Sequence, residues 1–354
     1  DTNGYTSESF EEGTVGLDMT LSLFEGFSRI NQVRFRKMNK ERSEWELKEK
    51  QNELAYQVTD AYYKLILERK LLDLALEQSR LSERYLKQTE VFVELGLKSA
   101  SDLQEVKARR EGDIYRYQSR GNSSRIALLH LKQLMNIQPG DTLAILDTIT
   151  ASQVPPYSVS TVETLYAQSI EILPSIRMID LKQKAAHKEY AIAGGAFSPS
   201  VFARFTVGSN YYNTAFSARQ LRDNIGKYVG VGISFPLLSG LQRLTNQRKL
   251  KLNMYRLKNE EELEKQQLYT DIEQTLLSLH TGYSEHQQAL SQLDAETLVL
   301  KESERKWEEG LISVFQLMEA RNRFIAAKAE LVRVRLQIEM MMKLEKYYRQ
   351  GTFL

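Results

Sequence analysis

The sequence predicts a mainly α-helical fold that also contains a few β-strands. The chain has 354 residues and repeats itself at a shift of 214 positions. One stretch, from Phe27 to Glu94, contains neither proline nor glycine. Shorter segments alternate apolar and polar residues, a pattern typical of a strand with one apolar face. Together these observations predict long helices and short strands arranged in two related halves.

The composition argues against several classes of protein. Charged residues make up 27% of the chain with a formal net charge of +2, so no excess of positive charge indicates a nucleic-acid partner. Cysteine is absent, which excludes disulfides and thiolate metal sites. His280 and His286 are six residues apart and do not share a helix face, and Gly230 and Gly232 lie within a strand pattern rather than before a helix. We therefore expect no enzyme, no metal site and no cofactor.

The internal repeat extends over much of each half. Residues 15–29 match residues 229–243, and Gly96-Leu97 matches Gly310-Leu311 at the same shift. No gap interrupts the register over roughly 95 residues. One extra residue would rotate a helix face by about 100°, so a continuous helix tolerates no insertion. The constant register therefore predicts one unbroken helix in each half.

The repeat also predicts elements that this chain lacks. The second half begins with a helical stretch from Thr161 to Ala193 and a strand from Pro199 to Tyr212. Subtracting 214 places their equivalents before residue 1. We therefore expect that a helix and a strand of the first half are missing from this chain.

Three segments are predicted as β-strands, at about residues 14–24, 199–212 and 226–238. In the first, Val15, Leu17 and Met19 alternate with Gly16 and Asp18. Each segment is about 10 residues long, close to the length that a tilted strand needs to cross a bilayer. On the strands alone, a soluble β-hairpin with one buried face is the alternative.

The other segments are predicted as two helical hairpins. The first half, residues 1–135, has a long helix at about 27–94, a tip at about 95–100 and a return helix at about 101–135. The second half, residues 161–354, has a first helix at about 161–193, a long helix at about 241–308, a tip at about 309–313 and a return helix at about 314–348. Residues 136–160 contain Pro139-Gly140 and Pro155-Pro156 and are predicted as an irregular segment. The first long helix would span roughly 100 Å.

Apolar residues at alternating spacings of four and three predict that each long helix packs along another helix, as in a coiled coil. The first seam is Leu54, Val58, Ala61, Leu65, Leu72 and Ala75, and its repeat equivalents are Leu268, Ile272, Thr275, Leu279, His286 and Ala289. Gly96 and Gly310 end the long helices, and Ser99 and Ser313 are suited to cap the return helices. These residues predict a tight helical hairpin in each half.

The order of these segments resembles the TolC family of outer-membrane efflux proteins. The resemblance is carried by the strand-to-helix junctions Leu23-Phe24-Glu25-Gly26 and Leu237-Leu238-Ser239-Gly240, by the tips 96–103 and 310–317, and by Leu173-Pro174 followed downstream by Ser198-Pro199. It covers almost the whole chain. No single motif is specific, but their order and duplication are.

Membership of this family implies a homotrimer with four strands per protomer and a 12-strand β-barrel in the outer membrane of a Gram-negative bacterium. It implies long coiled-coil hairpins that form an α-barrel across the periplasm, with residues 136–160 as an equatorial belt. The implied function is an outer-membrane channel of a tripartite efflux or type I secretion system, which passively conducts small molecules or proteins. The implied partners are a periplasmic adaptor protein, an inner-membrane transporter coupled through the adaptor, and outer-membrane lipid.

The family also implies a constriction at the periplasmic tip, formed by acidic side chains just after the Gly-Leu turn. The matching positions are Asp102, Glu105, Gln316 and Glu319. Three copies of one carboxylate around an axis form an acidic ring that selects cations and can gate a channel. Because one expected acid is Gln316, the ring of the second half could rest on Glu319 alone. The alternative is that these side chains lie on a solvated helix face.

Two further groups of residues at the tips are candidates for a function. Arg109, Arg321 and Arg323 are candidates for a latch that pairs with acids of a neighbouring hairpin. The alternative is three ordinary surface arginines, because exposed ion pairs are weak singly. The candidates for the adaptor contact are Gly96, Leu97, Ser99, Gly310, Leu311, Ile312 and Ser313. The alternative role of the apolar residues among them is to stabilise the hairpin.

Two other classes of protein share long helices. A periplasmic adaptor has a helical hairpin, but it carries a lipoyl-like β-domain and no tandem repeat with strands at each junction. A coiled-coil scaffold explains the helices but not the three strands. Both classes account for less of the sequence than an export channel does.

Overall fold

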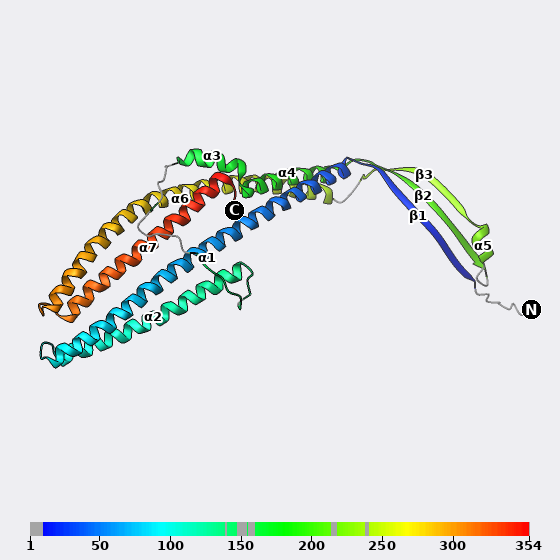
Figure 1. Cartoon of the computed structure of the whole chain (residues 1–354). Helices are drawn as coiled ribbons and strands as arrows, with labels where there is room; N and C mark the ends of the chain where they lie inside the picture. Colours follow the sequence, from blue (N-terminus) through cyan, green and yellow to red (C-terminus); the bar gives the residue numbers. More distant parts are fainter. Residues whose placement is uncertain are drawn as a thin grey trace, which may run out of the picture. The chain divides into compact units, whose positions relative to one another are not determined.

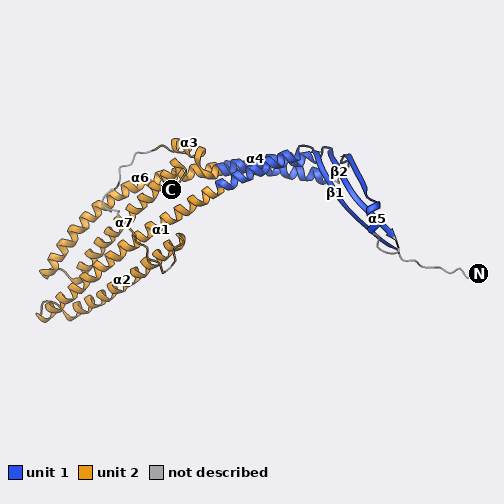
Figure 2. Cartoon of the chain, turned by 45° about the vertical axis from the view of Figure 1, so that its right-hand side comes forward, with its two compact units in different colours: residues 1–45, 177–263 blue, residues 46–176, 264–354 orange. Residues whose placement is uncertain are grey.

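The computed structural model describes residues 10–138, 140–146, 154, 160–213, 218–237 and 241–353. The chain divides into two compact units, which Figure 2 shows in different colours. We call residues 1–45 and 177–263 the strand unit, and residues 46–176 and 264–354 the hairpin unit. The two longest helices, α1 (Ser28–Glu94) and α6 (Gln242–Glu308), contribute residues to both units (Figure 1). The prediction of a mainly helical fold with few strands is confirmed.

The strand unit contains a three-stranded antiparallel sheet in the order β1-β2-β3. Its strands are β1 (Glu11–Glu25), β2 (Ser200–Asn213) and β3 (Gly226–Ser234). A short helix, α5 (Ala218–Asp223), lies in the connection between β2 and β3. β3 ends before Pro236, because proline has no N–H to donate to a strand ladder. The third strand is therefore shorter than the predicted 226–238, whose last residue lies outside the described part.

One face of the sheet, which we call the apolar sheet face, is apolar and mostly exposed, although Ala203 at its centre is buried. It comprises Val15, Leu17, Met19 and Leu21 of β1, Val201, Ala203, Phe205 and Val207 of β2, and Val229, Val231 and Ile233 of β3. Leu17 and Ile233 are each 74% exposed. Successive side chains point to opposite faces of a strand, so Asp18, Thr20, Arg204 and Thr206 occupy the other face, together with glycines and Phe202. There the Thr206 hydroxyl donates to the Asp18 carboxylate over 2.6 Å.

A β-bulge interrupts the alternation at Leu23. The register between β1 and β2 shifts between Ser22 and Phe24, so that Phe24 rather than Leu23 lies opposite Val201. The alternation of apolar and polar residues is therefore interrupted at Leu23, near the end of the predicted strand at 14–24. A bulge adds one residue to one strand and bends it, here just before the chain enters α1.

The two helical hairpins keep the shift of the sequence repeat. α1 and α6 each contain 67 residues, and both begin and end 214 residues apart. The return helices α2 (Ala100–Leu134) and α7 (Val314–Gln350) also begin 214 residues apart. None of the described helices carries a stretch that is long and apolar enough to cross a lipid bilayer.

The seam predicted for α6 is buried at all six positions. The seam of α1 is less buried, because Val58 and Leu72 are half-buried and Leu54, at the first position, is 47% exposed. Its equivalent, Leu268, packs in a core with Leu165 and Tyr348. Leu165 belongs to α3 (Val162–Ile172), and the described residues of the first half contain no counterpart of this helix. Leu54 is exposed because nothing in the described chain covers it as α3 covers Leu268.

The single helix predicted at residues 161–193 is wrong, because the structure has two helices there, α3 and α4 (Pro174–Gly195). Leu173 separates them with an extended backbone, φ −69° and ψ 133°. The residue before a proline is disfavoured in the helical conformation, so Pro174 causes the break. Proline itself is tolerated as the first residue of α4, where its missing N–H has no helical partner.

The irregular segment predicted at 136–160 is only partly described, since residues 139, 147–153 and 155–159 lie outside the described part. Within it, Leu143 and Ile145 pack against the buried core formed by Ala61, Leu65 and Leu131. The segment therefore covers the seam between α1 and α2 close to the end of α2.

Both long helices end in the same turn. Gly96 adopts a φ of 73° and Gly310 a φ of 77°. In each tip the N–H of the following leucine donates to the carbonyl five residues before it over 2.8 Å. This is the Schellman motif, in which a residue in the left-handed region lets the chain satisfy the last helical carbonyls.

Ser99 and Ser313 begin the return helices in capping boxes. The Ser99 hydroxyl accepts from the Asp102 N–H, and the Asp102 carboxylate accepts from the Ser99 N–H over 3.0 Å. Ser313 and Gln316 form the same pair. Glutamine serves in a capping box as an acid does, which accounts for Gln316 at a position where an acid was expected.

The tip turns generate a first prediction. Gly96→Ala should lower the free energy of unfolding by about 1 kcal/mol, because alanine disfavours a positive φ. Steric clash does not contribute, since a Cβ added at Gly96 would meet no atom within 4 Å. Gly112 lies inside α2 with equally open surroundings, so the control Gly112→Ala should raise the free energy of unfolding by about 0.5–1 kcal/mol. Denaturant titration of the purified protein would measure both, and effects of the same sign would contradict the assignment of the turn.

Candidate functional site

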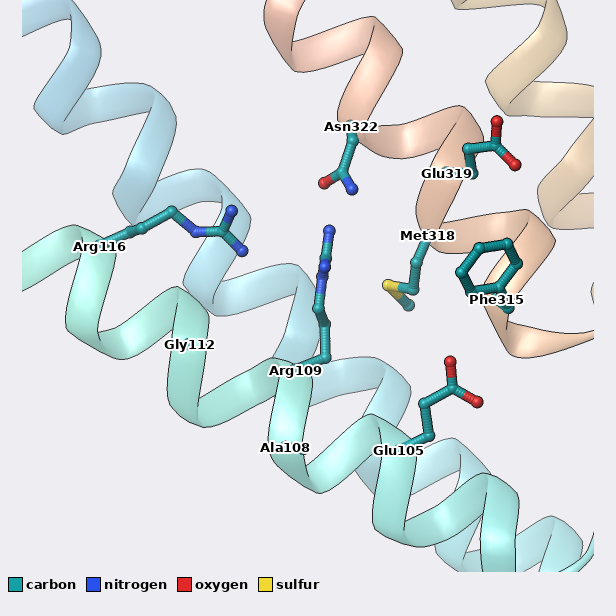
Figure 3. A pocket seen from close by; sticks show the side chains of 9 residues that line it. All are labelled: Glu105, Ala108, Arg109, Gly112, Arg116, Phe315, Met318, Glu319 and Asn322. Carbon is teal, nitrogen blue, oxygen red and sulfur yellow. The ribbon is translucent and has the colours of Figure 1, made fainter.

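The candidate site lies beside the tips, between α2 and α7 of the hairpin unit. A pocket of about 440 Å³ opens there, and Figure 3 shows the side chains that line it. The lining residues are Glu105, Ala108, Arg109, Gly112 and Arg116 of α2, and Phe315, Met318, Glu319 and Asn322 of α7. The structure thus brings together three residues that the sequence singled out: Glu105, Arg109 and Glu319.

The four candidate constriction residues fall into two pairs. Asp102 and Gln316 close the capping boxes. The pKa of Asp102 is lowered, first by the hydrogen bond from the Ser99 N–H and then by that from the Ser99 hydroxyl. Glu105 and Glu319 lie outside the caps and reach the pocket from the two hairpins (Figure 3). The pocket therefore carries the acids that have no part in starting a helix.

One of the three candidate latch arginines, Arg109, lines this pocket, and a second, Arg323, pairs with the lining residue Glu319. Arg109 extends from α2 toward Asn322 in Figure 3, and its Nε and Nη2 atoms are shielded from solvent without a hydrogen-bond partner. Arg323 binds Glu319 over 3.0 Å and Glu296 of α6 over 3.3 Å. Arg323 therefore holds one of the candidate constriction acids from within its own hairpin.

Arg321 is not a surface arginine, which corrects the expectation that it is exposed and pairs outward. Its side chain is 1% exposed, and its Nη1 lies 3.7 Å from the Asp113 carboxylate. Nη1 also donates to the Ser82 hydroxyl over 3.0 Å, and Nη2 donates to the Gln78 carbonyl. The Tyr85 ring centre lies 5.7 Å from the guanidinium carbon, within range of a cation–π contact. Burial lowers the pKa of Arg321, and the charge of Asp113 opposes this shift.

Asp113 supplies the negative charge of this buried network. Its side chain is fully buried and accepts from the Ser82 hydroxyl and from Arg116, the latter over 2.6 Å. Tyr85 in turn donates to Glu304 of α6 over 2.6 Å. Burial raises the pKa of the Tyr85 hydroxyl, and the bond to Glu304 raises it further. We call these residues the Arg321 network: Gln78, Ser82 and Tyr85 of α1, Asp113 of α2, Glu304 of α6 and Arg321 of α7.

An apolar core next to the network joins the same four helices. Trp307 is 1% exposed and meets the Tyr85 ring edge-on at 5.4 Å between ring centres. Ile312 packs against this core and so takes the stabilising role rather than that of an exposed contact. Leu97 and Leu311 are exposed, at 66% and 67%. The tips thus combine a rigid interior with two exposed apolar residues.

The sequence analysis missed Asp113 and Phe315. Phe315 is 63% exposed beside the tip and lines the pocket. A signal for Asp113 exists in the repeat, because its equivalent in the second half is Ala327, a buried residue. A charged residue at the equivalent of a buried alanine indicates a buried partner of opposite charge. The equivalent of Arg321 is the exposed Lys107, so the pair occurs once in the chain.

The comparison with protein families decides the identity of the fold. The family model described as outer membrane efflux protein matches residues 1–136 and 165–340. The chain belongs to this family. It is an outer-membrane channel of Gram-negative bacteria with a role in tripartite efflux, and it is not an enzyme. The adaptor and scaffold alternatives are thereby excluded.

Solved structures of outer-membrane channels share the fold. The CmeC channel of Campylobacter jejuni is 12% identical with a TM-score of 0.82, and the match covers 98% of this chain and 78% of that one. VceC of Vibrio cholerae is 14% identical with a TM-score of 0.81 and coverage of 98% and 88%. The open state of the Neisseria gonorrhoeae MtrE channel is 16% identical with a TM-score of 0.76 and coverage of 98% and 81%. Sequence comparison with individual curated proteins finds no match.

The Arg321 network generates a second prediction. Asp113→Asn should lower the free energy of unfolding by about 3–5 kcal/mol, because Arg321 would stay buried without its anion. The double variant D113L/R321M should recover most of this loss, since it removes both charges. Glu296→Gln is the control, because its partner Arg323 is 47% exposed, and it should cost less than about 1 kcal/mol.

Denaturant titration with hydrogen exchange of α2 and α7 would measure these effects. If Asp113→Asn cost no more than Glu296→Gln, the buried pair would not hold the two hairpins together.

Proposed function

We propose that three copies of this chain form the efflux channel, with a 12-strand β-barrel in the outer membrane and an α-barrel of helical hairpins in the periplasm. The observation that carries this proposal is the exposed apolar sheet face. β1 has 15 residues and β3 has nine, which suits strands that cross a bilayer at a tilt. A sheet in lipid must close on itself, because unpaired edges are too costly there. Four strands from each of three protomers would provide this closure.

The proposed membrane insertion generates a third prediction. Met19→Glu should lower the fraction of protein that enters vesicles, because a charge on the lipid-facing side of a barrel costs on the order of 1 kcal/mol or more. Thr20→Glu is the matched control, since it lies at nearly the same depth on the opposite face, across from Arg204. Flotation of the full chain with lipid vesicles would measure insertion. Equal insertion of the two variants would contradict the assignment of the lipid-facing side.

We also propose that Glu319, repeated around the trimer axis, forms an acidic constriction at the periplasmic tip. Its carboxylate is 56% exposed near the start of α7, and Glu105 reaches the same pocket from the other hairpin. Arg323 sets the position of Glu319 through their ion pair, which makes Arg323 a candidate to adjust the constriction. Arg109 has guanidinium atoms without a hydrogen-bond partner, so it is the candidate latch residue. Because its Nε and Nη2 are shielded from solvent, pairing with an acid of a neighbouring protomer would require this side chain to turn outward.

The exposed leucines of the tips, Leu97 and Leu311, are the proposed contact for a periplasmic adaptor protein, and Phe315 extends this apolar surface. An inner-membrane transporter would be coupled to the channel through this adaptor. The left-handed glycines favour such a contact, because Gly96 and Gly310 have open surroundings that allow close approach of another backbone.

The constriction generates a fourth prediction. Glu319→Gln should reduce the preference of the channel for cations, because it removes three charges from the proposed ring. The measurement is the reversal potential of single-channel currents in a planar bilayer under a KCl gradient. Glu302→Gln is the control, since Glu302 pairs with Arg305 on α6 and lines no part of the pocket. An unchanged reversal potential for Glu319→Gln would contradict the acidic ring.

A further inference from the structure

The first turns of both long helices contain basic residues but no acidic residue. Residues 28–40 of α1 contain five Lys or Arg and no acid, and residues 242–259 of α6 contain six Lys or Arg and no acid. The remainders of the two helices, residues 41–94 and 260–308, each contain 12 Asp or Glu. The balanced net charge of the whole chain conceals this separation.

The repeat preserves the basic positions in particular. Only four of the 13 positions from Ser28 to Lys40 are identical to their equivalents in α6, and three of these four are basic. The three pairs are Arg29 and Arg243, Arg34 and Arg248, and Lys37 and Lys251. The neighbouring residues differ between the halves, so the cations have been kept while their surroundings changed.

The electrostatics of the helix itself do not explain these cations. A helix N-terminus carries partial positive charge and is stabilised by acids, as Asp102 does in α2. The first turns of α1 and α6 contain no acid. Arg29 and Arg243 at these ends therefore act against the helix dipole. Arg29 has a local partner, because it pairs with Glu25 at the end of β1 over 3.4 Å. Several exposed cations further along the two helices have no such partner among the described residues, so a requirement from outside the helix remains as the reason for their presence.

An apolar-to-basic stripe runs down the start of each long helix. Ile30, Arg34 and Lys37 are separated by four and three residues, so they share one face of α1, and all are exposed. Leu244, Arg248 and Lys251 repeat this arrangement on α6. Arg34, Lys37, Arg248 and Lys251 make no ion pair with any described residue. Their charges are thus available to a partner outside the chain.

Each stripe begins at a strained residue beside the sheet. Phe27 and Leu241 are repeat equivalents, both adopt a φ of 63°, and they are 64% and 72% exposed. Bulky side chains are rare at positive φ, so this conformation is costly. In both halves the chain therefore leads from strand residues to an exposed apolar side chain and then to exposed cations. That order is typical of a segment that leaves a bilayer, with apolar anchors in the acyl region and cations at the phosphates.

We infer that these stripes bind the phosphate groups of anionic phospholipids in the leaflet where the strands leave the membrane. The inference rests on the proposed insertion of the β-strands. The binding residues are Arg34 and Lys37 of α1 and Arg248 and Lys251 of α6, and Phe27 and Leu241 anchor the start of each stripe. Phosphatidylglycerol provides the required chemistry, a single negative phosphate on a glycerol backbone.

The test compares two variants of the full chain in mixed micelles that contain phosphatidylglycerol or phosphatidylcholine. The stripe variant is R34Q/K37Q/R248Q/K251Q. The control variant, K87Q/K107Q/K301Q/K346Q, removes the same charge from exposed lysines of the hairpin unit that make no ion pair within the described chain. Native mass spectrometry counts the bound lipids. The wild type and the control should favour phosphatidylglycerol, and the stripe variant should lose this preference by about tenfold. Added salt should weaken binding to the wild type.

Binding of phosphatidylglycerol by the stripe variant at the wild-type level would overturn the inference. It would also be overturned if lipid binding were unchanged while the reversal potential in planar bilayers shifted toward cations, because the stripes would then line the conducting path. Flotation of the wild type separates this inference from the proposed function. A wild type that enters no vesicle contradicts membrane insertion itself, whereas a wild type that inserts without preferring phosphatidylglycerol contradicts the lipid site alone.

Discussion

A helix of 67 residues needs a buried seam along its length, because most helical stability in proteins comes from packing of one face. α7 supplies this packing for α6, where Leu279 is buried against Val334 and Ile338. α2 supplies it for α1, where Leu65 is buried with Leu131. An insertion in either long helix would turn its seam away from the partner. This constraint explains why α1 and α6 still begin and end at one constant shift.

The Arg321 network adds a second constraint, which joins one hairpin to the other. Within each hairpin, the long helix and the return helix are held together by apolar contacts along the seam. These contacts do not by themselves determine how one hairpin packs against the other. A buried charge without its counter-charge is costly, so Arg321 and Asp113 stabilise the fold only together. Their repeat equivalents, Lys107 and Ala327, cannot form such a pair. The network therefore distinguishes the two halves in a region where the backbone is duplicated.

Patterns of short range predicted most of the fold. The glycines and serines of the tips and the alternation of Val15, Leu17 and Met19 depend on neighbours in sequence, and these elements lie where the patterns place them. The burial of Arg321 depends instead on α1 and α2, and no spacing within α7 indicates it. The same holds for Leu54 and Leu268, because only Leu268 is covered by α3 in the described chain. The sequence alone therefore did not predict contacts between segments that are distant in sequence.

The network also limits how the proposed constriction can open. Glu319 lies two residues before Arg321 on α7, and Glu105 lies eight residues before Asp113 on α2, roughly 12 Å along the helix. The helices that carry the two acids are thus joined by the buried pair close to the pocket. A movement that separated α7 from α2 at this level would leave Arg321 without its anion. Movement of both hairpins of a protomer together keeps the pair intact, and so it is the less costly way to widen a ring of Glu319 carboxylates.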